Sequence, residues 1–231
     1  MSFLDLLLAF CLFSVTFAVA YRLRHRVHVS RKDYRLGDAV KNRALIAGTT
    51  AVMINTDCNS LAGQYLNSTP FNGDLPVLEK LVHERMAKRG LTGYGDKLVV
   101  HLRLGDLVDK LCASGKQCAE GRSSKRYWGR SIVGTPEIVK VLQRTGLKEV
   151  VLIGGAHRSK GLRKSDEYVK TLKDELLRQG FNVEVRINGD PDDDFCVMSS
   201  SKYFMRNVGG FSTLISDMVR RQNNVVFVGK D

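Results

Sequence analysis

The feature that most constrains the fold is a regular alternation of short apolar runs with amphipathic helices from about residue 95 onwards. Residues 149–154 (EVVLIG) form a nearly all-apolar run of strand length, and a helical pattern at residues 135–146 precedes it. Strands separated by helices of this length are typical of βαβ units, whose strands are parallel. We therefore predict an α/β fold, a Rossmann-like parallel sheet with helices on both faces.

The same patterns set the bounds of the predicted elements. Capping residues and a Pro in the first turn mark helix starts, and Gly marks helix ends. Strands are predicted at residues 97–103, 149–154, 182–187, 202–206 and 224–228, and helices at residues 74–90, 135–146, 165–180, 192–200 and 212–222, with Ser165 as a helix cap. A further strand is predicted within residues 44–54.

The first 35 residues are predicted to lie outside the fold. Residues 6–20 (LLLAFCLFSVTFAVA) are uncharged and apolar, and with their flanks they reach the length of a short membrane helix. A cleavable secretory signal is the alternative, because residues 18–20 (AVA) resemble a cleavage site, but no Lys or Arg precedes the apolar run. We expect an uncleaved single-pass anchor at residues 1–21, followed by a basic stem at residues 22–35.

The side of the membrane is left open by the sequence. The positive-inside rule places the basic stem in the cytoplasm, whereas a lumenal Golgi- or ER-type enzyme carries its basic flank before the span. Cys112 and Cys118 either close a small loop in an oxidising lumen or stay reduced in the cytosol. Residues 36–94 are predicted to form a reduced N-terminal region, and residues 95–231 the Rossmann-like domain.

The net charge of +12 favours anionic partners. Outside residues 21–35, however, the Lys and Arg residues are scattered, and no zinc-finger spacing or basic stripe interleaved with aromatic residues is present. We expect no nucleic-acid partner. A membrane-tethered basic adaptor for nucleic acid or acidic lipid is kept as an alternative.

In a parallel sheet the carboxyl ends of the strands meet at one edge, where such folds bind ligands. Four loops are predicted at this edge: residues 101–106, 154–158, 188–194 and 207–212. Arg103, in the first loop, is the centre of the hypothesis, because a guanidinium matches a phosphate or diphosphate and stabilises a leaving group's charge. The competing interpretation is that Arg103 pairs with Asp106 to fix the loop.

The other loops supply further candidates for binding and catalysis. A glycine turn that opens a helix offers free backbone N–H groups to phosphate. Adjacent carboxylates at a helix start are favoured by the helix dipole and rarely converge on one metal ion, so no metal site is expected. The candidates are Arg103 and Asp106 for catalysis, and His101, Arg103, His157, Asp193, Asp194, Gly209, Gly210, Phe211 and Ser212 for donor binding.

Two segments resemble the fucosyltransferase superfamily that shares a His-x-Arg-x-Gly/Thr-Asp motif and includes α-1,2- and α-1,6-fucosyltransferases and protein O-fucosyltransferases. The first is residues 101–106 (HLRLGD). The second begins Asp194-Phe195-x-x-Met198-Ser199-x-x-Lys202-Tyr203-Phe204 and ends Gly210-Phe211-Ser212. The resemblance covers about residues 95–231.

The resemblance implies a GT-B arrangement and an inverting, metal-independent transfer from GDP-fucose, with no cofactor. It assigns the donor diphosphate to Arg103 and phosphate binding to Gly210, Phe211 and Ser212. The chain departs from the family in two ways. Leu104 stands where the family usually has a second Arg, and the acceptor half is compressed into residues 36–94.

The sequence therefore predicts a membrane-associated glycosyltransferase that moves a sugar from a nucleotide-sugar donor to a hydroxyl of a glycan or protein acceptor. Arg103 binds the diphosphate, residues 209–212 complete the phosphate site, and residues 192–194 or His157 recognise the nucleoside. Asp106 is the candidate base. The alternative within this family is a non-catalytic relative that binds nucleotide or glycan.

Overall fold

The computed structural model describes residues 60–67, 75–122, 132–157 and 163–228. The chain divides into two compact units, residues 1–78 and 79–231. Helix α4 (Leu61–Asn67) belongs to the first unit, and α5 (Leu75–Arg89) begins there and continues into the second. The predicted anchor, the basic stem and the strand at residues 44–54 lie outside the described residues, and the domain bounds stay a prediction. No helix within the described ranges has the length and apolarity needed to cross a membrane.

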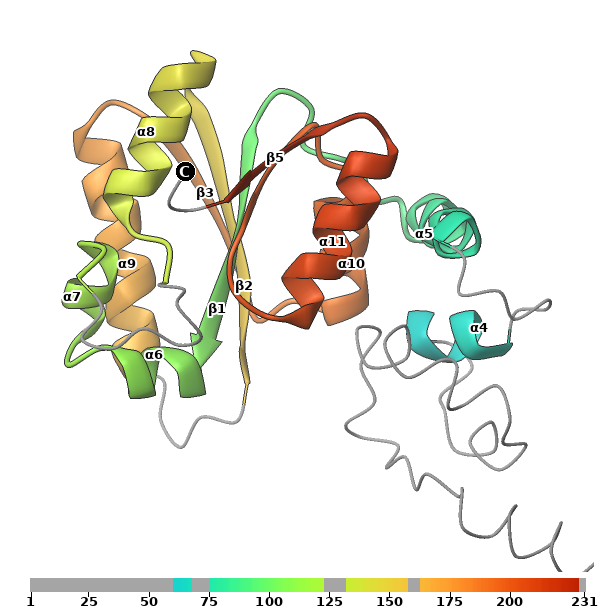
Figure 1. The fold of residues 1–231 in the computed structure, drawn as a ribbon, viewed down its shortest axis with the longest axis horizontal. Helices are drawn as coiled ribbons and strands as arrows, with labels where there is room; N and C mark the ends of the chain where they lie inside the picture. The colour runs from blue at the N-terminus through green and yellow to red at the C-terminus, as the bar shows by residue number, and fades with distance from the viewer. Residues whose placement is uncertain (1–59, 68–74, 123–131, 158–162, 229–231) are drawn as a thin grey trace, which may run out of the picture. The chain divides into compact units, whose positions relative to one another are not determined.

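The second unit is built on a five-stranded parallel sheet (Figure 1). Its strands are β1 (Leu98–Gly105), β2 (Glu149–His157), β3 (Asn182–Ile187), β4 (Tyr203–Arg206) and β5 (Val225–Val228), in the spatial order β3-β2-β1-β4-β5. All four neighbouring pairs are parallel. The chain leaves β1 in one direction to reach β2 and β3, then returns to the other side of β1 for β4 and β5. The carboxyl ends of β1 and β4 therefore flank the switch point at which such sheets bind ligands.

Helices cover both faces of this sheet, as Figure 1 shows. One face carries α6 (Asp106–Leu111), α7 (Gly115–Ala119), α8 (Thr135–Thr145) and α9 (Arg163–Arg178), and the other carries α10 (Pro191–Ser199) and α11 (Gly210–Arg221). The main apolar core takes every second residue of β1, namely Leu98, Val100, Leu102 and Leu104. Because successive side chains of a strand point to opposite faces, the intervening residues of β1 face α10 and α11. The predicted α/β fold is confirmed for this unit.

Helix α8 illustrates how local chemistry sets the bounds. Pro136 lies in its first turn, where a missing N–H costs nothing, and the Glu137 carboxylate accepts a hydrogen bond of 2.9 Å from the backbone N–H of Gly134. Gly146 ends the helix with a φ of 71°, a left-handed conformation that glycine adopts without strain. The helix predicted at residues 135–146 is thereby confirmed.

The loops predicted at residues 101–106 and 154–158 are wrong, because strands β1 and β2 extend into them. Residues 154–157 continue β2 and pair with β1 as far as Gly105 opposite His157. Gly154 permits this pairing, because a Cβ there would lie 2.3 Å from the carbonyl oxygen of Leu102. Ser165 is not a helix cap: α9 begins two residues earlier, and the Ser165 hydroxyl accepts a hydrogen bond from the N–H of Gly105.

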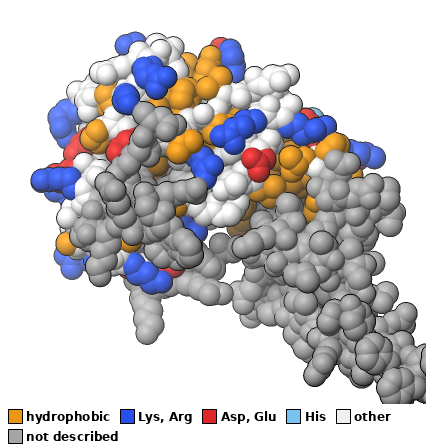
Figure 2. Space-filling view, viewed as in Figure 1, with side chains coloured by type: hydrophobic (Ala, Val, Ile, Leu, Met, Phe, Trp, Pro, Cys, Tyr) orange, Lys and Arg blue, Asp and Glu red, His pale blue; other side chains and the backbone are white. Residues whose placement is uncertain are grey.

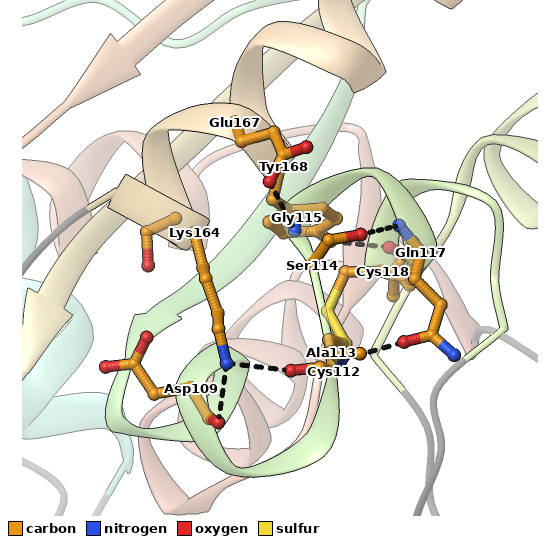
Figure 3. Close-up of a disulfide and its surroundings, with 12 residues drawn as sticks. Asp109, Cys112, Ala113, Ser114, Gly115, Gln117, Cys118, Lys164, Glu167 and Tyr168 are labelled. Carbon is orange, nitrogen blue, oxygen red and sulfur yellow. Dashed lines mark hydrogen bonds between the residues drawn. A yellow bond between two sulfur atoms is a disulfide. The ribbon is translucent and has the colours of Figure 1, made fainter.

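The short helices α6 and α7 were not predicted, and a disulfide between Cys112 and Cys118 joins them (Figure 3). Both cysteines are buried. The Lys164 ammonium donates to the carbonyl oxygen of Cys112 at 3.1 Å, and the N–H of Gly115 donates to Glu167 at 2.8 Å. These bonds hold the disulfide loop against α9. The loop in turn supports α6, which begins directly after β1.

Candidate functional site

Arg103 lies near the carboxyl end of β1 and faces the α11 side of the sheet. Its side chain is 33% exposed, and its ion pair among the described residues is a loose one, with Nη2 3.9 Å from Oδ1 of Asp106. Asp106 is also 3.6 Å from the Lys110 ammonium. Neither distance is that of a hydrogen bond. The Arg103 guanidinium is therefore held near Asp106 without forming a hydrogen bond to that carboxylate.

The glycine turn after β4 packs directly against this guanidinium. Gly209 has a φ of 111°, and a Cβ at this position would lie 2.5 Å from Nη1 of Arg103. The first backbone N–H groups of any α-helix have no intrahelical partner. Gly209 is the N-cap of α11 and has no side chain with which to accept a hydrogen bond from them. A guanidinium thus meets the positive end of a helix dipole. Such an arrangement attracts an anion.

Three buried side-chain atoms without a hydrogen-bond partner belong to residues of β1, of α6 and of the loop between β4 and α11. They are Nδ1 of His101, Oδ1 of Asp106 and Nδ2 of Asn207, and across the described ranges only Nε2 of Gln222 shares that condition. Leaving such an atom unsatisfied costs about 1–3 kcal/mol. Asp106 directly follows β1 and Asn207 directly follows β4, whereas His101 lies in the middle of β1 and reaches the start of α11 through its ring contact with Phe211.

His101 is a neutral imidazole at this site. Burial, with a smaller contribution from the Arg103 charge, lowers the pKa of His101 to about 4. Its ring contacts that of Phe211 in the first turn of α11, with 5.7 Å between centroids, and Phe211 in turn contacts buried Phe195. These ring contacts fix the helix start against β1. A neutral imidazole retains one donor and one acceptor nitrogen.

Ser212 was predicted to begin the helix at residues 212–222 and to bind phosphate. It is instead the third residue of α11, fully buried, and its hydroxyl accepts a hydrogen bond of 3.0 Å from the N–H of Asn207. This bond closes the turn between β4 and α11. The side chain therefore shapes the site. Backbone N–H groups of Gly210 and its neighbours are left as the groups positioned for an anion.

Asp193 and Asp194 are buried and already paired. Asp193 accepts hydrogen bonds of 2.8 Å from both Arg85 and Arg89, and Asp194 accepts one from Arg186 on β3. Burial alone would raise the pKa of Asp193, but the bonds from Arg89 and Arg85 outweigh it and lower that pKa. Burial dominates at Asp194 and raises its pKa despite Arg186. The structure thus joins these carboxylates to α5 and β3, and their role in donor binding stays a prediction.

His157 ends β2, opposite Gly105 in the register. Its backbone lies at the same carboxyl edge of the sheet as Arg103. Because β2 and β4 flank β1 on opposite sides, His157 and the glycine turn border the end of β1 from two directions.

Asn207 is the site residue that sequence reasoning did not single out. It lies at the start of the loop that had been placed at the ligand edge, directly after β4, and it is 3% exposed. A polar residue between a short strand and a glycine turn was the available signal. Its burial and its unpartnered Nδ2 became visible only in three dimensions.

Within the described part of the chain, no group of three or more His, Cys, Asp or Glu side chains is arranged to hold a metal ion. Metal independence stays a prediction.

Comparison with known proteins gives a weak structural likeness. No protein-family model and no curated protein sequence matches the chain. Among solved structures, POFUT1 in complex with GDP is 14% identical, with a TM-score of 0.41 over 66% of this chain and 46% of that one. POFUT1 in its apo form is 17% identical, with a TM-score of 0.40 over 68% and 51%. The chain therefore spans about half the length of these structures, and a likeness of this strength carries no argument about function.

Proposed function

We propose that the Rossmann-like unit binds the diphosphate of a nucleotide-sugar donor and belongs to an inverting, metal-independent glycosyltransferase, with GDP-fucose as donor. The observation that supports this most is the contact between the Arg103 guanidinium and the uncapped start of α11 at Gly209. Two positive groups meet at the switch point of a parallel sheet, with one loosely held carboxylate beside them. A diphosphate supplies the missing negative charge.

In this mechanism each group has a separate task. Arg103 and the first N–H groups of α11 bind the diphosphate and stabilise the charge that develops as the sugar bond breaks. Neutral His101 offers the diphosphate or ribose a hydrogen bond without adding charge. Asp106 is the candidate to accept the proton of the acceptor hydroxyl, because its Oδ1 has no hydrogen-bond partner in the described ranges. His157 is the candidate for contact with the nucleoside.

A nucleotide-binding relative without catalysis is the second candidate function. The ion pairs of Asp106 with Arg103 and Lys110 support it, because they give this carboxylate a structural task at the end of β1. The adaptor hypothesis is less well supported. Lys and Arg side chains are spread over the face shown in Figure 2 and do not gather into one stripe.

Titration calorimetry with GDP and UDP tests the donor site. We expect GDP to bind, UDP to bind more weakly, and Arg103→Ala to lose at least a hundredfold in GDP affinity, since the proposed charged contact with the diphosphate is removed. Arg220→Ala is the matched control, because Arg220 forms a similarly loose pair with Asp217 at 3.6 Å but lies elsewhere on α11. Equal GDP binding by wild type and Arg103→Ala would overturn the proposal.

Catalysis is tested separately with GDP-fucose. Transfer to a glycan or protein acceptor, or hydrolysis of the donor, distinguishes the enzyme from the non-catalytic relative. Activity that persists after chelation of divalent ions supports metal independence, and its loss would contradict that part of the proposal.

The disulfide supports a lumenal position for this unit. Disulfides persist in oxidising compartments and are rare in the cytosol. Protease protection of the unit in sealed microsomes is the expected result. Digestion without detergent would place it in the cytoplasm, as the basic stem at residues 22–35 favours.

A further inference from the structure

Asn207 carries an unused hydrogen-bond donor at the start of α11. Its Oδ1 accepts a bond of 2.8 Å from the N–H of Val208, and its own backbone N–H donates to Ser212. The first bond orients the carboxamide, since the oxygen faces Val208. The Nδ2 group, with two N–H donors, is buried and has no hydrogen-bond partner among the residues that the structure describes.

The surroundings of this carboxamide point to an anion. Asn207 is bonded to the first turn of α11, the same turn whose preceding residue, Gly209, touches the Arg103 guanidinium. The turn also carries Phe211, against which His101 packs, and His101 has its own unpartnered Nδ1. Two side chains more than nine-tenths buried thus leave polar atoms unsatisfied beside one uncapped helix start.

We propose that Asn207 is a ligand-binding residue, whose Nδ2 donates a hydrogen bond to a phosphate oxygen of the nucleoside diphosphate. The inference rests on the proposed function, since it assigns a further contact within the same site. The carboxamide adds a neutral donor to the cation of Arg103 and the N–H groups of α11. The bound phosphate in turn satisfies the donor that the free protein leaves unpaired.

The substitution Asn207→Asp tests for the N–H donor. An aspartate preserves the shape and keeps an oxygen to accept from Val208, so the turn retains its internal bond. GDP affinity equal to that of the wild type would show that Nδ2 does not hold phosphate. Because a carboxylate beside the diphosphate also repels it, a loss of affinity is read together with the amide NMR signals of the wild type.

Asn188→Asp is the matched control. Asn188 follows β3 at the same edge of the sheet, and its Oδ1 likewise accepts from a backbone N–H, that of Ala156 at 3.2 Å. We expect GDP affinity, measured by calorimetry on the full chain, to fall by ten- to a hundredfold in Asn207→Asp and to stay within twofold in Asn188→Asp. Circular dichroism confirms that both variants are folded.

Side-chain amide NMR on the wild type gives a readout that needs no folded variant. The Nδ2 protons of Asn207 should shift and exchange more slowly with water when GDP is added. A carboxamide with only a structural role would show neither change. Unchanged NMR signals, or unchanged GDP affinity in Asn207→Asp, would overturn the role of Asn207 and leave the proposed function standing. If the wild type does not bind GDP at all, the proposed function fails as well.

Discussion

Two groups of charged residues were predicted at the carboxyl edge of the sheet. They differ in how many of their hydrogen bonds are already formed within the protein. At the start of α10, Asp193 is buried and receives short hydrogen bonds from Arg85 and Arg89. At the end of β1, Arg103 has one loose carboxylate partner within the described part of the chain and a helix start beside it. A saturated cluster contributes to stability, whereas an unsaturated one is available to a ligand. Partner geometry therefore separates structural from binding residues.

The largest effect on stability is expected when the saturated cluster is broken. Asp193→Ala removes the buried carboxylate that Arg85 and Arg89 share, although Arg85 keeps its ion pairs with Asp190 and Asp192. The variant should lower the free energy of unfolding by about 3 kcal/mol. GDP affinity of the folded variant should be unchanged. Urea unfolding and calorimetry measure the two quantities, and Asp217→Ala, which removes an exposed pair, should cost less than about 0.5 kcal/mol. A loss of GDP binding in folded Asp193→Ala would restore its predicted role in donor recognition.

Gly209→Ala should damage the unsaturated cluster instead. The added Cβ would lie 2.5 Å from Nη1 of Arg103, so the guanidinium must move, and we expect GDP affinity to fall about a hundredfold. Gly180→Ala is the control: Gly180 has a φ of 84° but open space around it, so it tests backbone strain alone. Equal GDP affinities of Gly209→Ala and Gly180→Ala, measured by calorimetry, would contradict the contact between Gly209 and Arg103.

The buried imidazole makes stability depend on pH. The pKa of His101 is about 4 in the folded protein and about 6.5 when unfolded, so the unfolded state binds more protons between these values. Stability should therefore fall as pH drops from 7 to 5, by about 2 kcal/mol from this group. Urea unfolding at both pH values measures this decrease in the free energy of unfolding. In the variant His101→Gln, the part of the decrease that comes from the imidazole should be absent. An identical pH dependence in His101→Gln would show that the imidazole is not buried as described.

Asp106→Asn should change stability least. Its ion-pair distances of 3.9 and 3.6 Å contribute little, so we expect a change below about 1 kcal/mol, in contrast with Asp193. GDP affinity should not fall, because no negative charge is needed beside Arg103 for phosphate to bind. Fucose transfer should fall at least a hundredfold if Asp106 is the base. Transfer at the wild-type rate would exclude that role.

Much of the second unit could be predicted from residue patterns. The strand at residues 182–187 was predicted with its observed bounds, and the helix at 135–146 within one residue, because apolar periodicity and capping residues act locally. The extension of β1 and β2 could not be predicted in this way. It depends on Gly154 lying against Leu102 on a neighbouring strand, a contact between residues far apart in sequence.

The sequence by itself determined the parallel sheet, the edge that collects Arg103 and Gly209, and the choice of a guanidinium there, since each follows from periodicity and residue chemistry. Only the tertiary structure decided which polar groups at that edge are already satisfied. It paired Asp193 with arginines of α5, turned Ser212 inward and left Asn207 and His101 with unpartnered atoms. The reason is physical: a hydrogen bond depends on distance and direction across the fold, and neither is written in the order of residues.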